Sequence, residues 1–332
     1  MLPIEYIVAG GMLVAVTLYA ILGGADFGGG MWDLLARGPR AKSQRDLISS
    51  AIAPIWEANH VWLIVVLVLL FNAFPPAFYA LMVSLHVPLT LSLIGIVLRG
   101  AAFTFRHYDA HTDDVQRRWG RIFAIASTIT PVTLGMCVGA IASGKIPADV
   151  QQMDFFAAWL APFPAVIGLL TLSVFAYIAA VFLTVEAENP QVRDDFRARA
   201  LAAAALVFVF AWAAFALSGE GAPRVRAGLL HSRWSLAFHA VTGAFAITAI
   251  AALWARRFLI ARVAAALQVV FIIWGWGLAQ FPYLIEPSIT IESAAAPKAT
   301  LWILVTALAA GTVILVPSMY LLYRLFKAKR NT

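Results

Sequence analysis

Long apolar runs are the feature that most constrains how this chain of 332 residues can fold. Because about 20 residues of helix cross the ~30 Å hydrocarbon layer of a bilayer, each such run predicts a membrane-spanning helix. Windows of about 19 residues give nine spans, at residues 6–25, 52–73, 77–98, 121–143, 157–185, 200–217, 235–254, 261–281 and 300–323. We therefore expect an all-α polytopic membrane protein that forms one integral domain over residues 1–332. Nine spans suit two four-helix bundles plus one peripheral helix.

The composition excludes several other classes of protein. Hydrophobic residues make up 62% and charged residues 12% of the chain, against about 25% charged in ordinary soluble domains. Cys137 is the only cysteine, so a disulfide scaffold and cysteine-ligated zinc or iron–sulfur sites are excluded. The net charge of +7 comes from basic residues scattered among short connections. Because they form no basic face interleaved with aromatic residues, we expect no nucleic-acid partner.

The distribution of Lys and Arg predicts the orientation in the membrane. If the N-terminus lies outside, the inner segments carry 19 of the 24 basic residues and the outer segments carry 5. This bias favours an N-out, C-in topology under the positive-inside rule. The first span lacks a basic leader and a small-residue cleavage site, so we expect a retained helix and not a signal peptide.

Ionisable residues inside the spans are few, and each costs a few kcal/mol unless it is paired or hydrated. Asp26 lies near the end of the first span, Glu57 in the first turns of the second, and Arg99 at the end of the third. In the predicted topology all three reach a similar depth on the cytoplasmic side. We therefore expect Asp26, Glu57 and Arg99 to form one cluster.

The second span adds a spacing that is typical of a shared helix face. Glu57 and His60 are three residues apart, and Trp56 and His60 are four apart, so the three side chains lie on or beside one face. Glu57 could take a proton from cytoplasmic water and pass it to His60, whose ordinary pKa is about 6.5. Alternatively, Glu57 is a paired anchor for Arg99, and His60 is a hydrogen-bonded packing residue.

Histidines in two spans allow a haem hypothesis, because neutral imidazole binds haem iron. His60 and His86 are the candidate ligands, although membrane histidines more often form hydrogen bonds between helices. Gly28 belongs to a small-residue stripe with Gly24, which indicates close helix packing. Trp62 and the other tryptophans are interpreted as packing or interfacial residues.

Four segments of the sequence resemble subunit II of the cytochrome bd family of quinol oxidases, including its cyanide-insensitive branch. The resemblance extends over essentially the whole chain, and the second segment is the most specific. The segments are residues 25–31 (ADFGGGM), 52–64 (IAPIWEANHVWLI), 99–103 (RGAAF) and 281–285 (FPYLI) with 287–288 (PS). The sequence also departs from the family pattern, since Glu57 stands where many relatives have Asp and Gly23 stands where they have a second acid.

The resemblance implies a non-haem subunit of a quinol:dioxygen oxidoreductase in the respiratory chain of a bacterial inner membrane. It implies a larger partner, subunit I, that carries the haems (b and d, or b type) and oxidises quinol. It further suggests a small single-helix subunit and a structural quinone or lipid. Subunit II would support subunit I and supply a cytoplasm-facing proton route. In that route Glu57 is the proton-accepting acid, His60 a relay, Asp26 and Asn59 hydrogen-bond organisers, and Arg99 the charge partner.

Three alternatives stay open from the residues alone. Buried acids and glycine-interrupted helices would also suit a proton-coupled secondary transporter, although no inverted repeat emerges. A chain that binds its own haem b through His60 and His86 is the second alternative. The third is an assembly scaffold, in which the polar cluster only sets the packing of the first three helices.

Overall fold

The computed structural model describes residues 3–52, 56–108, 113–147 and 156–328. Residues 53–55, which belong to the predicted span 52–73, lie outside the described residues. Within the described ranges the chain forms thirteen helices and one two-stranded hairpin. The elements are α1 (Ile4–Leu34), α2 (Ala41–Ile52), α3 (Trp56–Ala73), α4 (Pro75–Ser84), α5 (His86–Tyr108), α6 (Asp113–Ala142), α7 (Pro162–Glu186), α8 (Pro190–Gly221), α9 (Pro223–His231), α10 (Ser235–Trp254), α11 (Phe258–Gln280), β1 (Tyr283–Ile285), β2 (Ile289–Thr290), α12 (Ile291–Ala294) and α13 (Lys298–Ala328).

The prediction of nine spanning helices is confirmed, because nine helices in the described ranges are long and apolar enough to cross a membrane. They are α1, α3, α5, α6, α7, α8, α10, α11 and α13. Prolines at the first turns of α4, α7 and α8 mark where these helices begin, since proline has no N–H to lose there. Asn189 also caps α8 by accepting a hydrogen bond from the Gln191 amide at 2.8 Å.

The third predicted span, 77–98, has the wrong boundaries. The helix breaks at Leu85, so that α4 ends at Ser84 and the membrane-spanning helix α5 starts at His86. Pro88 explains the break, because proline cannot donate to the carbonyl four residues earlier, which here belongs to Ser84, and its ring clashes with that carbonyl. The first span is also longer than predicted, since α1 continues to Leu34.

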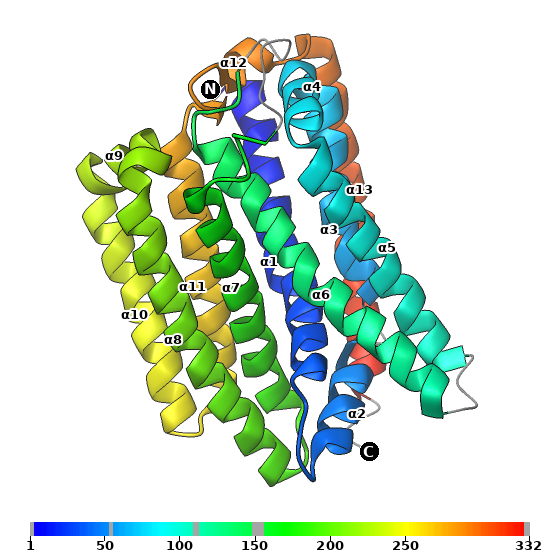
Figure 1. The fold of residues 1–332 in the computed structure, drawn as a ribbon. Coiled ribbons are helices and arrows are strands. Elements are labelled where there is room, and N and C mark those ends of the chain that lie inside the picture. The colour runs from blue at the N-terminus through cyan, green and yellow to red at the C-terminus, as the bar shows by residue number, and fades with distance from the viewer. Residues whose placement is uncertain (1–2, 53–55, 109–112, 148–155, 329–332) are drawn as a thin grey trace.

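The spanning helices form the two bundles and the peripheral helix that the sequence predicts (Figure 1). The first bundle contains α1, α3, α5 and α6, and the second contains α7, α8, α10 and α11. Helix α7 packs against both α1 and α6, which joins the bundles. Helix α13 contacts α1 and α3 but is largely exposed. Figure 1 shows α1 at the centre of the molecule, on the side of the first bundle that meets α7.

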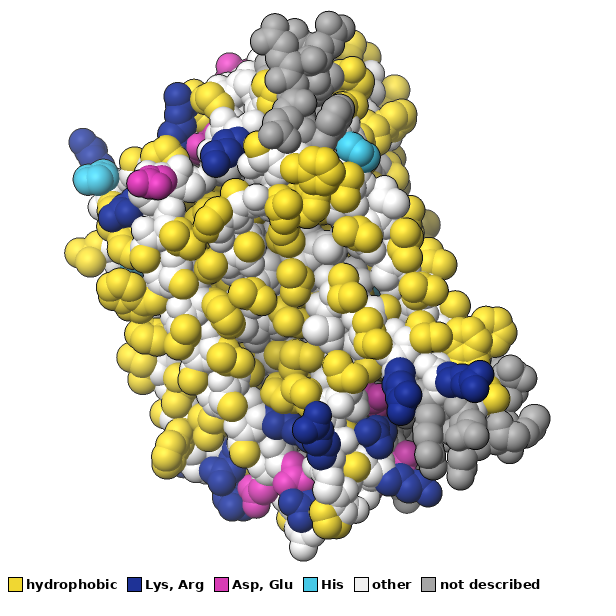
Figure 2. All heavy atoms as spheres, in the orientation of Figure 1, with side chains coloured by type: hydrophobic (Ala, Val, Ile, Leu, Met, Phe, Trp, Pro, Cys, Tyr) yellow, Lys and Arg dark blue, Asp and Glu magenta, His cyan; other side chains and the backbone are white. Residues whose placement is uncertain are grey.

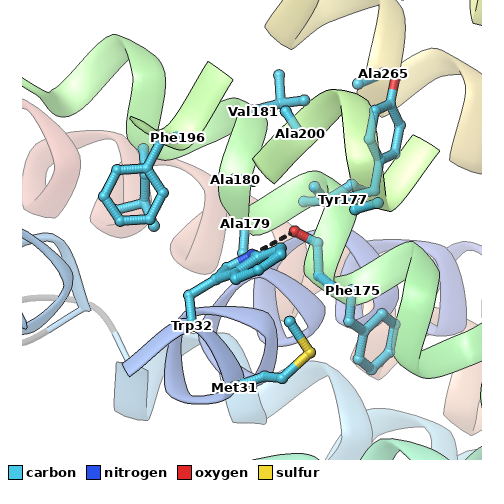
Figure 3. Packing of buried hydrophobic residues seen from close by; sticks show 14 of the residues in the cluster. Met31, Trp32, Phe175, Tyr177, Ala179, Ala180, Val181, Phe196, Ala200 and Ala265 are labelled. Atoms are coloured by element: carbon cyan, nitrogen blue, oxygen red, sulfur yellow. Dashed lines mark hydrogen bonds between the residues drawn. The ribbon is translucent and has the colours of Figure 1, made fainter. Parts of the chain in front are cut away.

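The contact between α1 and α7 is unusually close. A Cβ atom on Gly28 would lie 2.0 Å from the backbone oxygen of Phe175, so only glycine allows the two backbones to approach this far. One helical turn after Gly28, the indole Nε1 of Trp32 donates a hydrogen bond of 2.8 Å to the Ala176 carbonyl (Figure 3). Gly28 therefore acts in packing, as its glycine stripe predicts.

The surface divides into an apolar middle and two polar ends (Figure 2). Basic side chains gather mainly at the end where α2 and the C-terminus lie. The short elements α4, α9 and α12 lie at the opposite end, near the N-terminus. A belt of apolar side chains between charged ends is the pattern expected of a chain that spans a bilayer.

Candidate functional site

Asp26 is buried inside the first bundle. Because α1 continues two turns beyond it, the carboxylate lies within the helix and not at its end. Its side chain is 3% exposed, and its Oδ2 accepts a hydrogen bond of 2.9 Å from Asn59 Nδ2. The same Asn59 amide also points toward the Leu22 carbonyl at 3.5 Å. The Asn59 side chain from α3 therefore holds the carboxylate of α1 in place.

Arg99 supplies the positive charge from α5. It is 1% exposed, and its Nη1 lies 3.0 Å from His60 Nε2. The guanidinium carbon also lies 4.8 Å from the ring centroid of Phe27 and 5.5 Å from that of Phe123, which are cation–π distances. The charges of Arg99 and Asp26 attract each other. The structure thus brings together Asp26, Asn59, His60 and Arg99, which we call the charged cluster.

The charged cluster is enclosed by aromatic rings. The His60 ring lies 5.8 Å from Tyr19, 5.6 Å from Phe27 and 6.4 Å from Trp56, measured between centroids. Trp56 also packs on Phe103 at 5.9 Å. These walls exclude lipid and lower the local dielectric, which strengthens every charge interaction inside.

Several polar atoms in this region are buried without a hydrogen-bond partner among the described side chains. They are Arg99 Nε and Nη2, His60 Nδ1 and the Tyr19 hydroxyl. Buried polar groups in native proteins are almost always paired, either with protein or with ordered water. The arrangement is therefore suited to water molecules that link the charged cluster.

Glu57 does not join the charged cluster, so the predicted contact of Asp26, Glu57 and Arg99 is wrong for this residue. It is the second residue of α3, and its side chain is exposed. Arg99 pairs with His60 instead. The reason is helical geometry, because Glu57 and Asn59 lie about 160° apart around the axis, and the face with Asn59 turns toward Asp26 on α1.

Comparison with known proteins identifies the family. Residues 4–326 match the family described as "Cytochrome bd terminal oxidase subunit II". The chain belongs to this family. The resemblance that the sequence segments indicate is thereby confirmed, and the chain is a subunit of a cytochrome bd quinol oxidase, an oxidoreductase complex.

Two curated relatives show how far this subunit II has diverged. It is 23% identical over 326 residues to the "Putative cytochrome bd menaquinol oxidase subunit II" of Bacillus subtilis, covering 94% of this chain and 92% of that relative. It is 28% identical over 217 residues to the "Cytochrome bd-I ubiquinol oxidase subunit 2" of Escherichia coli, covering 63% of this chain and 55% of that relative.

A solved structure confirms the fold. A chain of the bd oxidase from Geobacillus thermodenitrificans superimposes with a TM-score of 0.82 and 23% identity, over 97% of this chain and 98% of that chain. The arrangement of nine spanning helices in the described part of this subunit II therefore matches a bd oxidase.

The hypothesis that His60 and His86 hold one haem does not fit this subunit II. His60 lies against Arg99, whereas His86 is exposed at the start of α5 and its Nδ1 lies 2.9 Å from the Val83 carbonyl. Thirteen residues of helix between His86 and Arg99 correspond to about 20 Å. Two histidines that ligate one iron must approach it from opposite sides within a few Å, so this pair cannot do so.

Some residues of the site were not anticipated from the sequence of this subunit II. Tyr19 precedes Asp26 by seven residues, which is two helical turns on the same face, so its position beside the site could have been found. Phe123 offered no such signal, because its contact with Arg99 depends on how α6 packs against α5. Trp62, expected to pack, does contact the main hydrophobic core.

Proposed function

We propose that this subunit II stabilises the haem-bearing subunit I of its oxidase and supplies a proton route from the cytoplasm for the reduction of oxygen to water. The charged cluster is the observation that carries the proposal. A buried carboxylate and a buried guanidinium are costly in a bilayer and mark proton or ion pathways when they occur there. Asp26 and Arg99 contact Asn59 and His60, which follow the exposed acid Glu57 by two and three residues on α3.

The proposed partners and location are those that the family resemblance implies. The complex sits in the inner membrane of a bacterium, and its haems (b and d, or b type) reside in subunit I, where they would transfer electrons from quinol to oxygen. A small single-helix subunit and a structural quinone or lipid complete the complex. The proposed topology is N-out, C-in, which the gathering of basic side chains near the C-terminus supports (Figure 2).

The proposed route starts at the surface and runs inward. Glu57 takes a proton from cytoplasmic water, because its side chain is exposed at the basic end of α3. His60, three residues further along the same helix, receives it through ordered water at Nε2 when that nitrogen is released from Arg99. Asp26, oriented by Asn59, organises the interior end, and Arg99 is its charge partner.

The Glu57→Gln variant of the assembled oxidase tests this route. Oxygen consumption should fall about tenfold or more, because a positioned proton donor is lost, while the subunits still assemble because Glu57 is exposed. Glu188→Gln is the matched control, since Glu188 is an exposed acid in the turn between α7 and α8. Unchanged turnover in Glu57→Gln would remove Glu57 from the route.

The same experiment separates the proposal from its alternatives. A pure scaffold predicts a lower yield of complex with an unchanged rate per complex. A proton-coupled transporter predicts substrate-dependent proton flux by this chain alone in vesicles. The charged cluster is compatible with both alternatives, and no other observation favours either of them.

A further inference from the structure

A groove of about 480 Å³ opens at the basic end of the second bundle. The end of α7, the start of α8 and the start of α11 form its walls. Two arginines, Arg193 and Arg257, line it together with the apolar side chains Val185, Phe258, Leu259 and Ile260. None of these residues belongs to the charged cluster or to the proposed proton route.

Arg193 is held in a fixed position in the groove. Its Nε donates a hydrogen bond of 3.0 Å to the Ala187 carbonyl at the end of α7, and its Nη2 donates to the same oxygen. Its guanidinium carbon lies 5.6 Å from the ring centroid of Phe258. The Nη1 group remains for another acceptor, so the side chain is preorganised and not a mobile surface charge.

Two carboxylates near the groove, those of Asp194 and Glu186, are already paired with other arginines. Asp194 forms ion pairs with Arg197 and Arg256, and Glu186 forms an ion pair with Arg262 at 3.2 Å. Among the described residues, Arg193 and Arg257 have no carboxylate partner. The groove therefore keeps an excess of positive charge that an anion can neutralise.

The apolar side of the groove continues onto the membrane-facing surface of α11. Leu259 is 68% exposed and Ile260 is 46% exposed. Trp254, at the end of α10, is also exposed at this level, and tryptophan prefers the boundary between headgroups and hydrocarbon. The groove thus lies where a phosphate would meet the basic side chains and acyl chains would meet the apolar ones.

We propose that this groove binds the headgroup of an anionic glycerophospholipid. The phosphodiester lies between Arg193 and Arg257, and the acyl chains run along Leu259 and Ile260. The first amides of α11, which have no acceptor inside the helix, add to the attraction for an anion. Basic pockets between membrane helices bind anionic headgroups in this way. A free phosphate ion would use the arginines but leave the apolar wall without a partner.

Native mass spectrometry of the purified, delipidated oxidase complex tests the proposal in the wild type. Titration with phosphatidylglycerol should give one retained lipid that phosphatidylcholine does not displace, and excess inorganic phosphate should not displace it either. Equal retention of phosphatidylcholine would overturn the proposal. Displacement of the lipid by inorganic phosphate would show a phosphate site without lipid specificity, and would also overturn it.

Variants assign the binding to this groove. Arg257→Ala should weaken phosphatidylglycerol binding about fivefold, because one basic residue near an anionic lipid contributes about 1 kcal/mol. Arg193→Ala with Arg257→Ala should weaken it about 25-fold. Arg37→Ala is the matched control, since Arg37 is an exposed arginine in the turn after α1, outside the groove. Binding that is unchanged in Arg257→Ala, or reduced equally in Arg37→Ala, would overturn the assignment.

Discussion

Arg99 Nη1 and His60 Nε2 face each other at 3.0 Å between α5 and α3. Arginine has donors only, so Nε2 must be the acceptor and the imidazole must be neutral, with its hydrogen on Nδ1. A positively charged imidazolium could not keep this contact. Proton transfer through His60 and its hydrogen bond with Arg99 therefore exclude each other at any one moment, which makes the pair a gate in the proposed route.

Two substitutions of His60 separate its structural role from its role in proton transfer. His60→Gln keeps an acceptor for Arg99, so the complex should assemble normally, while its oxygen consumption falls because the amide does not titrate. His60→Leu removes the acceptor and should destabilise the complex by about 1–3 kcal/mol. Thermal unfolding and oxygen consumption of the purified complexes measure the two effects. Full activity of His60→Gln would show that His60 only positions Arg99.

Asp26→Asn should impair assembly more than activity per complex. The substitution removes the negative charge that attracts Arg99. Because the two groups form no direct ion pair among the described contacts, we expect a loss of up to about 3 kcal/mol. The yield and thermal midpoint of the complex report the loss. Asp46→Asn, at an exposed position of α2, is the matched control. An unchanged midpoint in Asp26→Asn would mean that Arg99 finds its countercharge elsewhere.

The spans and the charged cluster could be predicted from the sequence because both follow from the high cost of polar groups in lipid. That cost makes the apolar runs long, and it makes Asp26 and Arg99 conspicuous within them. Asp26 and Arg99 lie eight and nine residues before the ends of α1 and α5, so their similar depth follows from counting helices.

Rotation of helices about their axes could not be predicted in the same way. Glu57 and Asn59 lie two residues apart on α3, yet one is exposed and the other is buried against Asp26. Which of them faces inward depends on the packing of α3 against α1, and the helix is apolar on all sides. The charge of Glu57 led to the prediction that its side chain faces Asp26. The uncharged Asn59 occupies that position instead.

Gly28→Ala tests the close contact of α1 and α7. The added Cβ would lie 2.0 Å from the Phe175 carbonyl oxygen, so the helices must separate, at a cost of about 1–3 kcal/mol. Gly10→Ala on the same helix is the control, because nothing lies within 4 Å of its Cβ position; it should stabilise the helix by up to about 1 kcal/mol. Thermal unfolding of both variants measures the difference. Equal midpoints would show that α7 adjusts freely.

Glu286 makes the stability of the subunit depend on pH. It lies in the turn between β1 and β2, outside the spanning helices, and is 2% exposed. Burial raises the pKa of Glu286 from 4.5 to about 7, and the positive charge of Arg224 opposes this shift. Because the folded state holds the proton more tightly than the unfolded chain does, the stabilisation is complete below about pH 4.5 and is lost as the pH rises through about 7.

Glu286→Gln should abolish this dependence, because the amide imitates the protonated carboxyl at every pH. The variant should exceed the wild type in stability at pH 8, by on the order of 2 kcal/mol, and equal it near pH 4. Thermal midpoints of the purified complex between pH 4 and pH 8 measure the effect. Glu220→Gln, at an exposed acid near the end of α8, should leave the wild-type pH dependence intact. If Glu286→Gln instead lowers the stability at pH 8, the carboxylate is ionised in the folded subunit, and its attraction to Arg224 outweighs the cost of burial.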